Sequence, residues 1–376
     1  MTLSKTIELP QLDDYRSFFL NNTPLLDVRA PVEFNQGAFP CTTNVPLMND
    51  HERTVIGIRY KERGQDDAIK LGHELVQGSI KSDRVEQWSK FIKQHPQGVL
   101  YCFRGGMRSK ISQQWIYEQT GIIFPRIKGG YKAMRRFLIN ELEISSQHML
   151  PIVLSGRTGI GKTLLLNTIK PKIDLEGIFH HRGSVFGKHV TPQPSQIDIE
   201  NTLSIALLKL RHQGHIQIIL EDESCNIGSR KLPECLFEKM KQSPIVLLEA
   251  PIEERIDIIF QEYILEALTE HQAFYGEEKG FQCWTEQLQE ALDNIQRRLG
   301  GVRHKQLKLL LFNAIQQHKS GNAEAHKEWI KILLVDYYDP MYDYQLNKKQ
   351  ERVIFKGMQN EVHNYLTNKL SEHNKL

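Results

Sequence analysis

A glycine-rich loop between an apolar run and an amphipathic segment constrains the fold of this chain more than any other feature. The run IVLS at 152–155 leads directly into GRTGIGKT at 156–163, a full match to GxxxxGK[ST]. Such a loop holds phosphate only between a buried strand and a helix, where its backbone N–H groups turn inward. The residues expected to hold a diphosphate are Gly156, Arg157, Thr158, Gly159, Gly161, Lys162 and Thr163. The sequence therefore predicts a P-loop domain built on a parallel sheet.

Acidic residues follow a second apolar run of this domain. The run 216–220 ends in Glu221, Asp222 and Glu223, where P-loop proteins keep the acid that orients a metal ion or water. Glu221 and Asp222 are both candidates, and their spacing does not decide between them. The Thr163 hydroxyl would hold Mg²⁺ where a metal is used. A purely structural role, in which these acids cap the following turn, stays open.

The chain contains 376 residues, which is more than one hydrophobic core usually serves, so we expect two domains at 1–140 and 141–376. Short apolar runs alternate with amphipathic segments in both, with strands expected at 24–28 and 98–101, and then at 152–155, 216–220 and 245–249. We expect helices at 110–120, 287–299, 304–318 and 348–370, and no strand after about residue 255. The predicted class is α/β, with a P-loop NTPase-like parallel-sheet domain that carries a helical C-terminal appendage.

Composition excludes several classes of protein. The chain is 40% hydrophobic and 25% charged, and no run reaches the roughly 18 apolar residues of a membrane span. The first 15 residues lack the apolar core of a signal peptide, so a cytoplasmic location without membrane contact is expected. Five cysteines without a CxxC pair favour neither a disulfide framework nor a zinc site, and we predict no bound metal of that kind.

A second anion-binding loop is expected in the first domain. The apolar run 99–101 leads into Cys102, a glycine-containing loop and a helix. Backbone N–H groups at a helix N-terminus would bind an anion there and favour the thiolate form of Cys102. Gly105 and Gly106 permit the backbone angles of such a loop, while Arg104 and Arg108 add positive charge. A buried structural cysteine is the weaker alternative.

Two groups of polar residues are candidates for contact with nucleic acid. Between residues 126 and 136 the chain has five cations and no acid, namely Arg126, Lys128, Lys132, Arg135 and Arg136. They could form a face that contacts phosphates, or only a solvated helix between the domains. The loop after the first P-loop helix contains His180, His181 and Arg182, which could transfer protons or bind an anion, although such a pair of histidines is more often structural.

The N-terminal domain resembles the rhodaneses. The resemblance covers about residues 10–140 and rests on LLDVRAPVEF at 25–34, GAFP at 37–40 and NVPL at 44–47. It implies that Cys102 is the chalcogen carrier of a rhodanese-like domain. Five residues separate Cys102 from Arg108, whereas most single-domain rhodaneses have four, and the longer loop is similar to that of cysteine phosphatases and arsenate reductases. A wider loop suits a tetrahedral anion, so a phosphatase and a phosphate-bearing donor such as selenophosphate both stay open.

The order of motifs along nearly the whole chain resembles the tRNA 2-selenouridine synthases. They are CFRGGMRS, GRTGIGKT, DLEGIFHHRGS, EDES, LEAPIEER, RLGGVRH and YYDPMYDYQL. The resemblance implies an enzyme that converts the 2-thio group of the wobble uridine in tRNAs for lysine, glutamate and glutamine to 2-seleno. Selenophosphate is the implied selenium donor, and the implied intermediate is an S-geranyl thiouridine formed from geranyl diphosphate.

The same resemblance divides the motifs between two half-reactions. The P-loop would bind geranyl diphosphate without ATP hydrolysis, and the Cys102 loop would receive or guide selenium. The cations at 126–136 and the loop of His180, His181 and Arg182 would contact the tRNA anticodon arm. We expect a monomer with no tightly bound cofactor. The enzyme that makes selenophosphate would supply its selenium donor. The alternative function is a cysteine-dependent sulfurtransferase or phosphatase fused to a P-loop kinase.

Overall fold

A computed structural model describes residues 8–373, and the chain divides into two compact units. Unit 1 comprises residues 1–144 and 195–209, and unit 2 comprises 145–194 and 210–376. This division differs from the predicted continuous domains 1–140 and 141–376, because the segment 195–209 packs with the N-terminal unit. The first seven residues, on which the expected cytoplasmic location partly depends, lie outside the described part.

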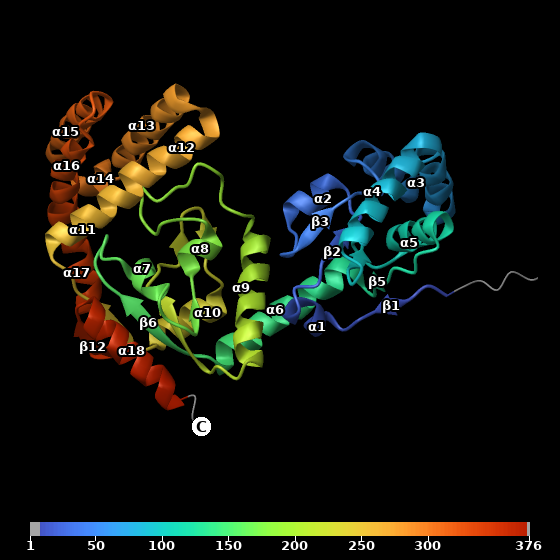
Figure 1. The fold of residues 1–376 in the computed structure, drawn as a ribbon, viewed down its shortest axis with the longest axis horizontal. Coiled ribbons are helices and arrows are strands. Elements are labelled where there is room, and N and C mark those ends of the chain that lie inside the picture. Colours follow the sequence, from blue (N-terminus) through green and yellow to red (C-terminus); the bar gives the residue numbers. More distant parts are fainter. Residues whose placement is uncertain (1–7, 374–376) are drawn as a thin grey trace, which may run out of the picture. The chain divides into compact units, whose positions relative to one another are not determined.

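Unit 1 is built around a parallel sheet of five strands in the order β1-β5-β4-β2-β3 (Figure 1). Its strands are β1 Gln11–Leu12, β2 Leu25–Asp27, β3 Thr42–Asn44, β4 Val99–Tyr101 and β5 Arg126–Ile127. Its helices are α1 Tyr15–Leu20, α2 Pro31–Gln36, α3 Asp50–Leu75, α4 Gly78–Gln94, α5 Met107–Thr120, α6 Gly130–His148 and α9 Gln196–His212, the last two extending past the unit's boundary.

Separate apolar clusters cover the two faces of this sheet. One joins β2 and β4 to α4 and α5 and contains the fully buried Trp88. The other contains Phe19 of α1, Met134 of α6, and Ile205 and Leu208 of α9. Burial of both faces explains why β2 and β4 are continuous apolar runs in the sequence.

Unit 2 contains a second parallel sheet, in the order β12-β11-β6-β8-β7. These strands are β6 Leu150–Ser155, β7 Lys172–Ile173, β8 Gln217–Glu221, β11 Ile245–Leu248 and β12 Val353–Gly357; β9 Asn226–Ile227 and β10 Arg230–Lys231 form a separate antiparallel pair. Helices α7 Lys162–Leu166, α8 Leu175–Phe179, α10 Glu234–Gln242 and α18 Gln359–His373 accompany the sheet. The two parallel sheets confirm the predicted α/β class.

The strand β12 corrects the prediction that 348–370 is helical throughout. Residues Val353–Gly357 pair in parallel with β11 at the edge of the sheet, and only α18 beyond them is helical. In the run VIFKG, half-buried and exposed positions alternate, which is the period of a strand with one covered face. Helix α18 then buries Val362, Leu366 and Leu370 in the core of the sheet.

The predicted helical C-terminal region is confirmed, and it has a core of its own. Its elements are α11 Ile252–Ile259, η1 Phe260–Glu266, α12 Ala267–Tyr275, α13 Glu277–Asn294, α14 Gln296–Leu299, α15 Gly301–Lys319, η2 Ala323–Ala325, α16 His326–Leu333, η3 Leu334–Tyr338, α17 Asp339–Asn347 and η4 Gln350–Arg352 (yellow to red in Figure 1). Trp284 of α13 and Trp329 of α16 are almost fully buried in one apolar cluster. Within residues 8–373, no helix is both long and apolar enough to cross a membrane.

Polar contacts predict that α9 stabilises unit 1. The Asn201 side chain donates to the Ala38 carbonyl over 2.7 Å and accepts from Arg135 over 2.9 Å. Since Asn201 is fully buried, Asn201→Ala should lower the free energy of unfolding by about 1–3 kcal/mol, the usual result of leaving buried polar groups unpaired. Urea unfolding would measure this, with His212→Ala at the exposed end of α9 as the control. An equal, small effect of both variants would contradict the assignment.

Candidate functional site

The predicted thiol lies at the carboxyl end of β4, in the centre of the unit 1 sheet. Cys102 is only 3% exposed, and its Sγ donates to the Ser109 hydroxyl over 3.2 Å. Ser109, in the first turn of α5, donates in turn to the Gly106 carbonyl over 3.0 Å. The residues Cys102, Arg104, Gly105 and Gly106 therefore form one loop between β4 and α5, as the sequence predicts, and Arg108 begins the helix.

A second glycine-containing segment, Gly129-Gly130, packs against the backbone of this loop. Gly105 has a φ of 65°, and an added Cβ there would lie 2.6 Å from the Gly129 nitrogen. At Gly130 an added Cβ would lie 2.1 Å from the Cys102 carbonyl oxygen, an oxygen that also accepts from the Tyr131 N–H. Only glycine permits so close an approach of two backbones. The pair Gly129-Gly130 was missed as part of the site, although two adjacent glycines before a helix are a usable signal.

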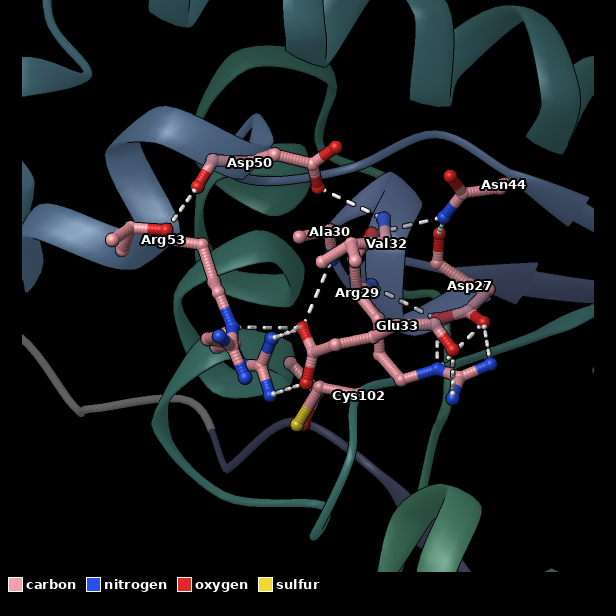
Figure 2. A network of polar contacts seen from close by, with 12 residues as sticks. Asp27, Arg29, Ala30, Val32, Glu33, Asn44, Asp50, Arg53 and Cys102 are labelled. Carbon is pink, nitrogen blue, oxygen red and sulfur yellow. Dashed lines mark hydrogen bonds and ion pairs between the residues drawn. The ribbon is translucent and has the colours of Figure 1, made fainter. Parts of the chain in front are cut away.

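An acidic side chain of α2, Glu33, contacts the start of the helix that follows the loop (Figure 2). Glu33 of α2 accepts from Arg108 Nη1 over 2.5 Å and Nη2 over 3.1 Å, and its Oε2 also accepts from the Ala30 N–H. Burial opposes ionisation of Glu33, but the contacts with Arg108 outweigh it and lower the pKa of this carboxyl. Arg108 thus has a carboxylate partner in addition to its expected role toward an anion.

A buried ion pair holds the element that carries Glu33. Asp27 ends β2, and its Oδ2 lies 2.6 Å from Arg29 Nη2, with both side chains at most 1% exposed. Arg29 also donates to the Glu33 and Gly37 carbonyls, and its guanidinium lies 3.9 Å from the centre of the Tyr131 ring. Through these two carbonyls, Arg29 holds α2 against the end of β2.

The P-loop of unit 2 has the predicted position. Gly156, Arg157, Thr158, Gly159 and Gly161 lie between β6 and α7, and Lys162 and Thr163 start α7. Lys162 Nζ donates to the Gly156 carbonyl over 3.3 Å, so the ammonium bends back over the loop. The cradle of N–H groups and one cation is a general site for a diphosphate.

Two carboxylates lie at the Thr163 hydroxyl, whose oxygen is 2.8 Å from Glu221 Oε1 and 3.0 Å from Glu176 Oε2. Glu221 is fully buried and also accepts from the Leu175 and Glu176 N–H groups. Burial and the neighbouring Glu176 raise the pKa of Glu221 to about 7, and the same two causes raise the pKa of Glu223 well above its usual value. Glu221 and Glu176 are therefore the acids placed beside the P-loop, and Glu176 was missed by sequence reasoning.

Asp222, the other candidate acid, points to different partners. It accepts from Ser155 Oγ over 2.5 Å and from Lys349 Nζ over 2.9 Å. Adjacent residues of a strand point to opposite faces of a sheet, which separates Asp222 from Glu221 at the strand end. The oxygens of Thr163, Glu221 and Glu176 are donors that suit Mg²⁺ when substrate phosphates complete its shell.

The helical region braces the back of the P-loop. Arg255 of α11 donates to the Thr158 carbonyl and lies 2.6 Å from Asp339 at the start of α17. Arg157 forms two contacts of 2.8 Å between its Nη2 and the Asp343 carboxylate, although the sequence predicted it as a ligand of the diphosphate. The motifs around Arg255 and Asp339 thus act on the shape of the loop.

Comparisons with known proteins agree with these motifs. Residues 149–373 match the family described as the tRNA 2-selenouridine synthase AAA domain. A tRNA 2-selenouridine synthase of Marinobacter nauticus is 53% identical over 349 residues, which cover 93% of this chain and 95% of that protein. The chain belongs to the tRNA 2-selenouridine synthase family. Synthases of Sulfurovum sp. and Pseudomonas fluorescens are 48% and 50% identical, covering 96% and 94% of this chain and 98% and 96% of those proteins. The predicted family and the prediction that the chain is an enzyme are confirmed.

The five cations predicted to face tRNA differ from one another in their surroundings. Arg126 donates to the Gly105 carbonyl over 2.8 Å, and Arg135 pairs with Glu200 and Asn201, so both stabilise unit 1. Lys128 lies on the surface 3.2 Å from Asp13. Lys132 and Arg136 are exposed four residues apart on α6, which places them on one side of that helix.

The side chains of His180 and Arg182, in the loop after α8, contact other residues of unit 2, and His181 between them is buried. His180 Nε2 lies 2.7 Å from the Thr191 hydroxyl, and the His180 ring stacks on His189. His181 is buried, and burial, with the charges of His189 and Lys188, lowers its pKa to about 4, so it is neutral at pH 7. Arg182 Nη2 lies 2.6 Å from Glu270. Arg182 and Lys188 supply positive charge in this loop.

The ion pair of Asp27 and Arg29 predicts a large effect on stability. Arg29→Met should lower the free energy of unfolding of the unit by about 3–5 kcal/mol, because it leaves the Asp27 carboxylate buried without its partner. Chemical denaturation followed by circular dichroism would measure the loss, with Arg16→Met at an exposed position of α1 as the control. A loss no greater than that of the control would show that the pair does not stabilise the unit.

The pKa of Glu221 predicts a pH dependence of stability. Between its ordinary value of 4.5 and about 7, the folded protein binds the proton of Glu221 more tightly than the unfolded chain. The free energy of unfolding should therefore fall as pH rises through this window. Glu221→Gln should weaken this fall, whereas Glu234→Gln at an exposed position of α10 should not change it. Unfolding curves in urea at a series of pH values would distinguish the two; identical pH profiles would refute the assignment.

Proposed function

We propose that this chain replaces sulfur by selenium at position 2 of a wobble 2-thiouridine in tRNA, through an S-geranyl intermediate. The chain belongs to the tRNA 2-selenouridine synthase family and has two separate loops of the type that binds anions, and only one of them contains a thiol. This pair of loops is the observation that carries the proposal. Family membership supports the tRNA substrate, and the two loops support a division into two half-reactions.

The P-loop of unit 2 suits the first half-reaction. The base sulfur would form a bond to the terminal carbon of geranyl diphosphate, while the carbon–oxygen bond breaks and diphosphate leaves. The loop amides and Lys162 would stabilise the departing negative charge. Mg²⁺ entering with the diphosphate would be held by Thr163 and Glu221. ATP hydrolysis is not required, because alkylation itself converts the sulfur into a leaving group.

The Cys102 loop suits the second half-reaction. The selenium of selenophosphate would form a bond to carbon 2 of the base, the carbon–sulfur bond would break, and the geranyl thiolate would leave. Water would then cleave the phosphorus–selenium bond, which releases phosphate and leaves selenium on carbon 2. Cys102 would guide the selenium toward carbon 2 without forming a bond to it, and Arg104 would bind the phosphate group of selenophosphate. An enzyme that makes selenophosphate is then the metabolic partner of this chain.

Exposed cations are the best candidates for contact with the tRNA backbone. Lys128, Lys132 and Arg136 lie on the surface of unit 1, and each phosphate that they neutralise would release a counterion. The anticodon arms of tRNAs for lysine, glutamate and glutamine are the proposed substrates, with the wobble base unstacked for reaction.

Two variants separate the half-reactions. Cys102→Ser should abolish selenation and let S-geranyl-2-thiouridine accumulate, because the P-loop is unchanged. Lys162→Ala should slow geranylation by about 100-fold or more, the usual effect of removing one charge-stabilising group, yet leave selenation of pre-geranylated tRNA largely intact. Mass spectrometry of nucleosides after reaction with geranyl diphosphate and selenophosphate would measure both.

Folded variants that lose both half-reactions together would refute this division of roles. Binding of ATP with release of ADP during modification, and no geranylated nucleoside at any time, would return the P-loop to a kinase or ATPase role. Hydrolysis of aryl phosphates that depends on Cys102 would instead favour the phosphatase alternative.

A further inference from the structure

A large cavity in unit 1 opens directly onto the Cys102 loop. Its volume is about 1100 Å³, which is at the upper end of the range for small-molecule sites. One wall is the loop from Cys102 to Arg108, and the opposite wall is α3. The selenium-bearing part of selenophosphate would occupy only the loop end of this space.

The walls away from the loop are mainly apolar. Leu47, Met48, Ala68 and Val76 line the cavity and are buried, and the Trp115 ring contributes a further apolar surface. A cavity for a free phosphate or a nucleotide would need polar groups along its length, since burying unpaired polar groups is costly. These walls fit an aliphatic chain.

The mouth of the cavity combines apolar and positive groups. Ile58 and Tyr60 of α3 are 51% and 56% exposed, and Met107 at the loop end is 38% exposed. Lys61 and Lys110 line the same space and are exposed. Exposed apolar side chains rimmed by cations are typical of a site for an apolar group attached to an anion.

Arg104 and Arg126 lie near the thiol and have N–H groups that are available to a ligand. Arg104 is exposed beside Cys102, and Arg126 Nε is buried without a hydrogen-bond partner although Nη1 of the same side chain is satisfied by Gly105. Both side chains line the cavity. The selenophosphate anion is therefore expected at the thiol end, beside Cys102.

We propose that this cavity binds the geranyl chain carried on sulfur by the modified wobble base and thereby places carbon 2 of that base at Cys102. This inference rests on the proposed function, and it adds the binding site of the intermediate. The chain would enter between α3 and the loop, while the RNA phosphates remain at the cationic mouth. A free geranyl diphosphate is the competing occupant.

Two substitutions would close the site without disturbing the fold. Gly57 lines the cavity from within α3, and an added Cβ there meets no atom within 4 Å, so Gly57→Phe would fill the space. Ile58→Glu would place a carboxylate at the mouth, where the side chain is already half exposed. Glu62→Phe is the matched control, because Glu62 is exposed on the same helix and does not line the cavity.

The test is the binding of two anticodon stem-loops to the full-length protein carrying Cys102→Ser, which prevents selenation. One RNA carries chemically synthesised S-geranyl-2-thiouridine and the other carries 2-thiouridine. Fluorescence anisotropy should show at least tenfold tighter binding of the geranylated RNA. Gly57→Phe and Ile58→Glu should each remove this preference without changing the affinity for the 2-thiouridine RNA, and Glu62→Phe should retain it.

A preference that survives both cavity substitutions would overturn the proposal, as would equal affinity for the two RNAs. Competition by geranyl diphosphate that is lost in Gly57→Phe, with no preference between the RNAs, would assign the cavity to the donor and overturn it as well. Failure of the proposed function is separable, because an enzyme that never forms geranylated tRNA could still bind the synthetic RNA through this cavity.

Discussion

The buried contact between Asp27 and Arg29 fixes the geometry on which the thiol site of unit 1 depends. A charged pair at most 1% exposed is tolerated because Arg29 also donates to the carbonyls of Glu33 in α2 and of Gly37 just after it, and faces the Tyr131 ring. These contacts place α2 so that Glu33 reaches Arg108 on the opposite side of the thiol loop. Desolvation makes such a pair a weak source of net stability, but it strongly disfavours any arrangement that leaves one charge alone. The position of the loop is therefore set by electrostatics as well as by apolar packing.

The P-loop of unit 2 depends on a comparable set of contacts from the other end of the sequence. Arg255 and Arg157 connect the loop to acidic residues of α17, and Asp222 joins Ser155 to Lys349. The helical region is thus part of the phosphate site, and motifs near residues 255 and 340 that look remote from GRTGIGKT hold its backbone. A loop braced in this way needs little reorganisation when charge develops on a ligand, as the proposed departure of diphosphate requires.

The electrostatics around Thr163 suit the proposed chemistry. Glu221 and Glu176 are buried close together, and their mutual repulsion favours a bound proton or a cation between them. The Cys102 thiol instead contacts the Ser109 hydroxyl, and Glu33, the acidic side chain that lines the adjoining cavity, is paired with Arg108. The two loops therefore differ in what they can stabilise: one suits a diphosphate with a cation, and the other suits an anion delivered to a thiol beside an apolar cavity.

The sequence by itself determined the features that depend on local chemistry. The P-loop, the position of Cys102 at the end of a strand, and the strands β2, β4, β6, β8 and β11 of the two parallel sheets could be predicted, because glycine spacing and apolar runs specify backbone conformation over a few residues. Only the tertiary structure decided which side chains meet across long separations. Glu33 and Arg108 are 75 positions apart, Glu221 rather than Asp222 reaches Thr163, and Arg126 and Arg135 turn inward while Lys132 and Arg136 stay exposed. The strand β12 and the packing of 195–209 in unit 1 likewise depend on sheet edges and apolar faces supplied by distant segments. These long-range contacts depend on the packing of the whole unit, which no local sequence pattern specifies.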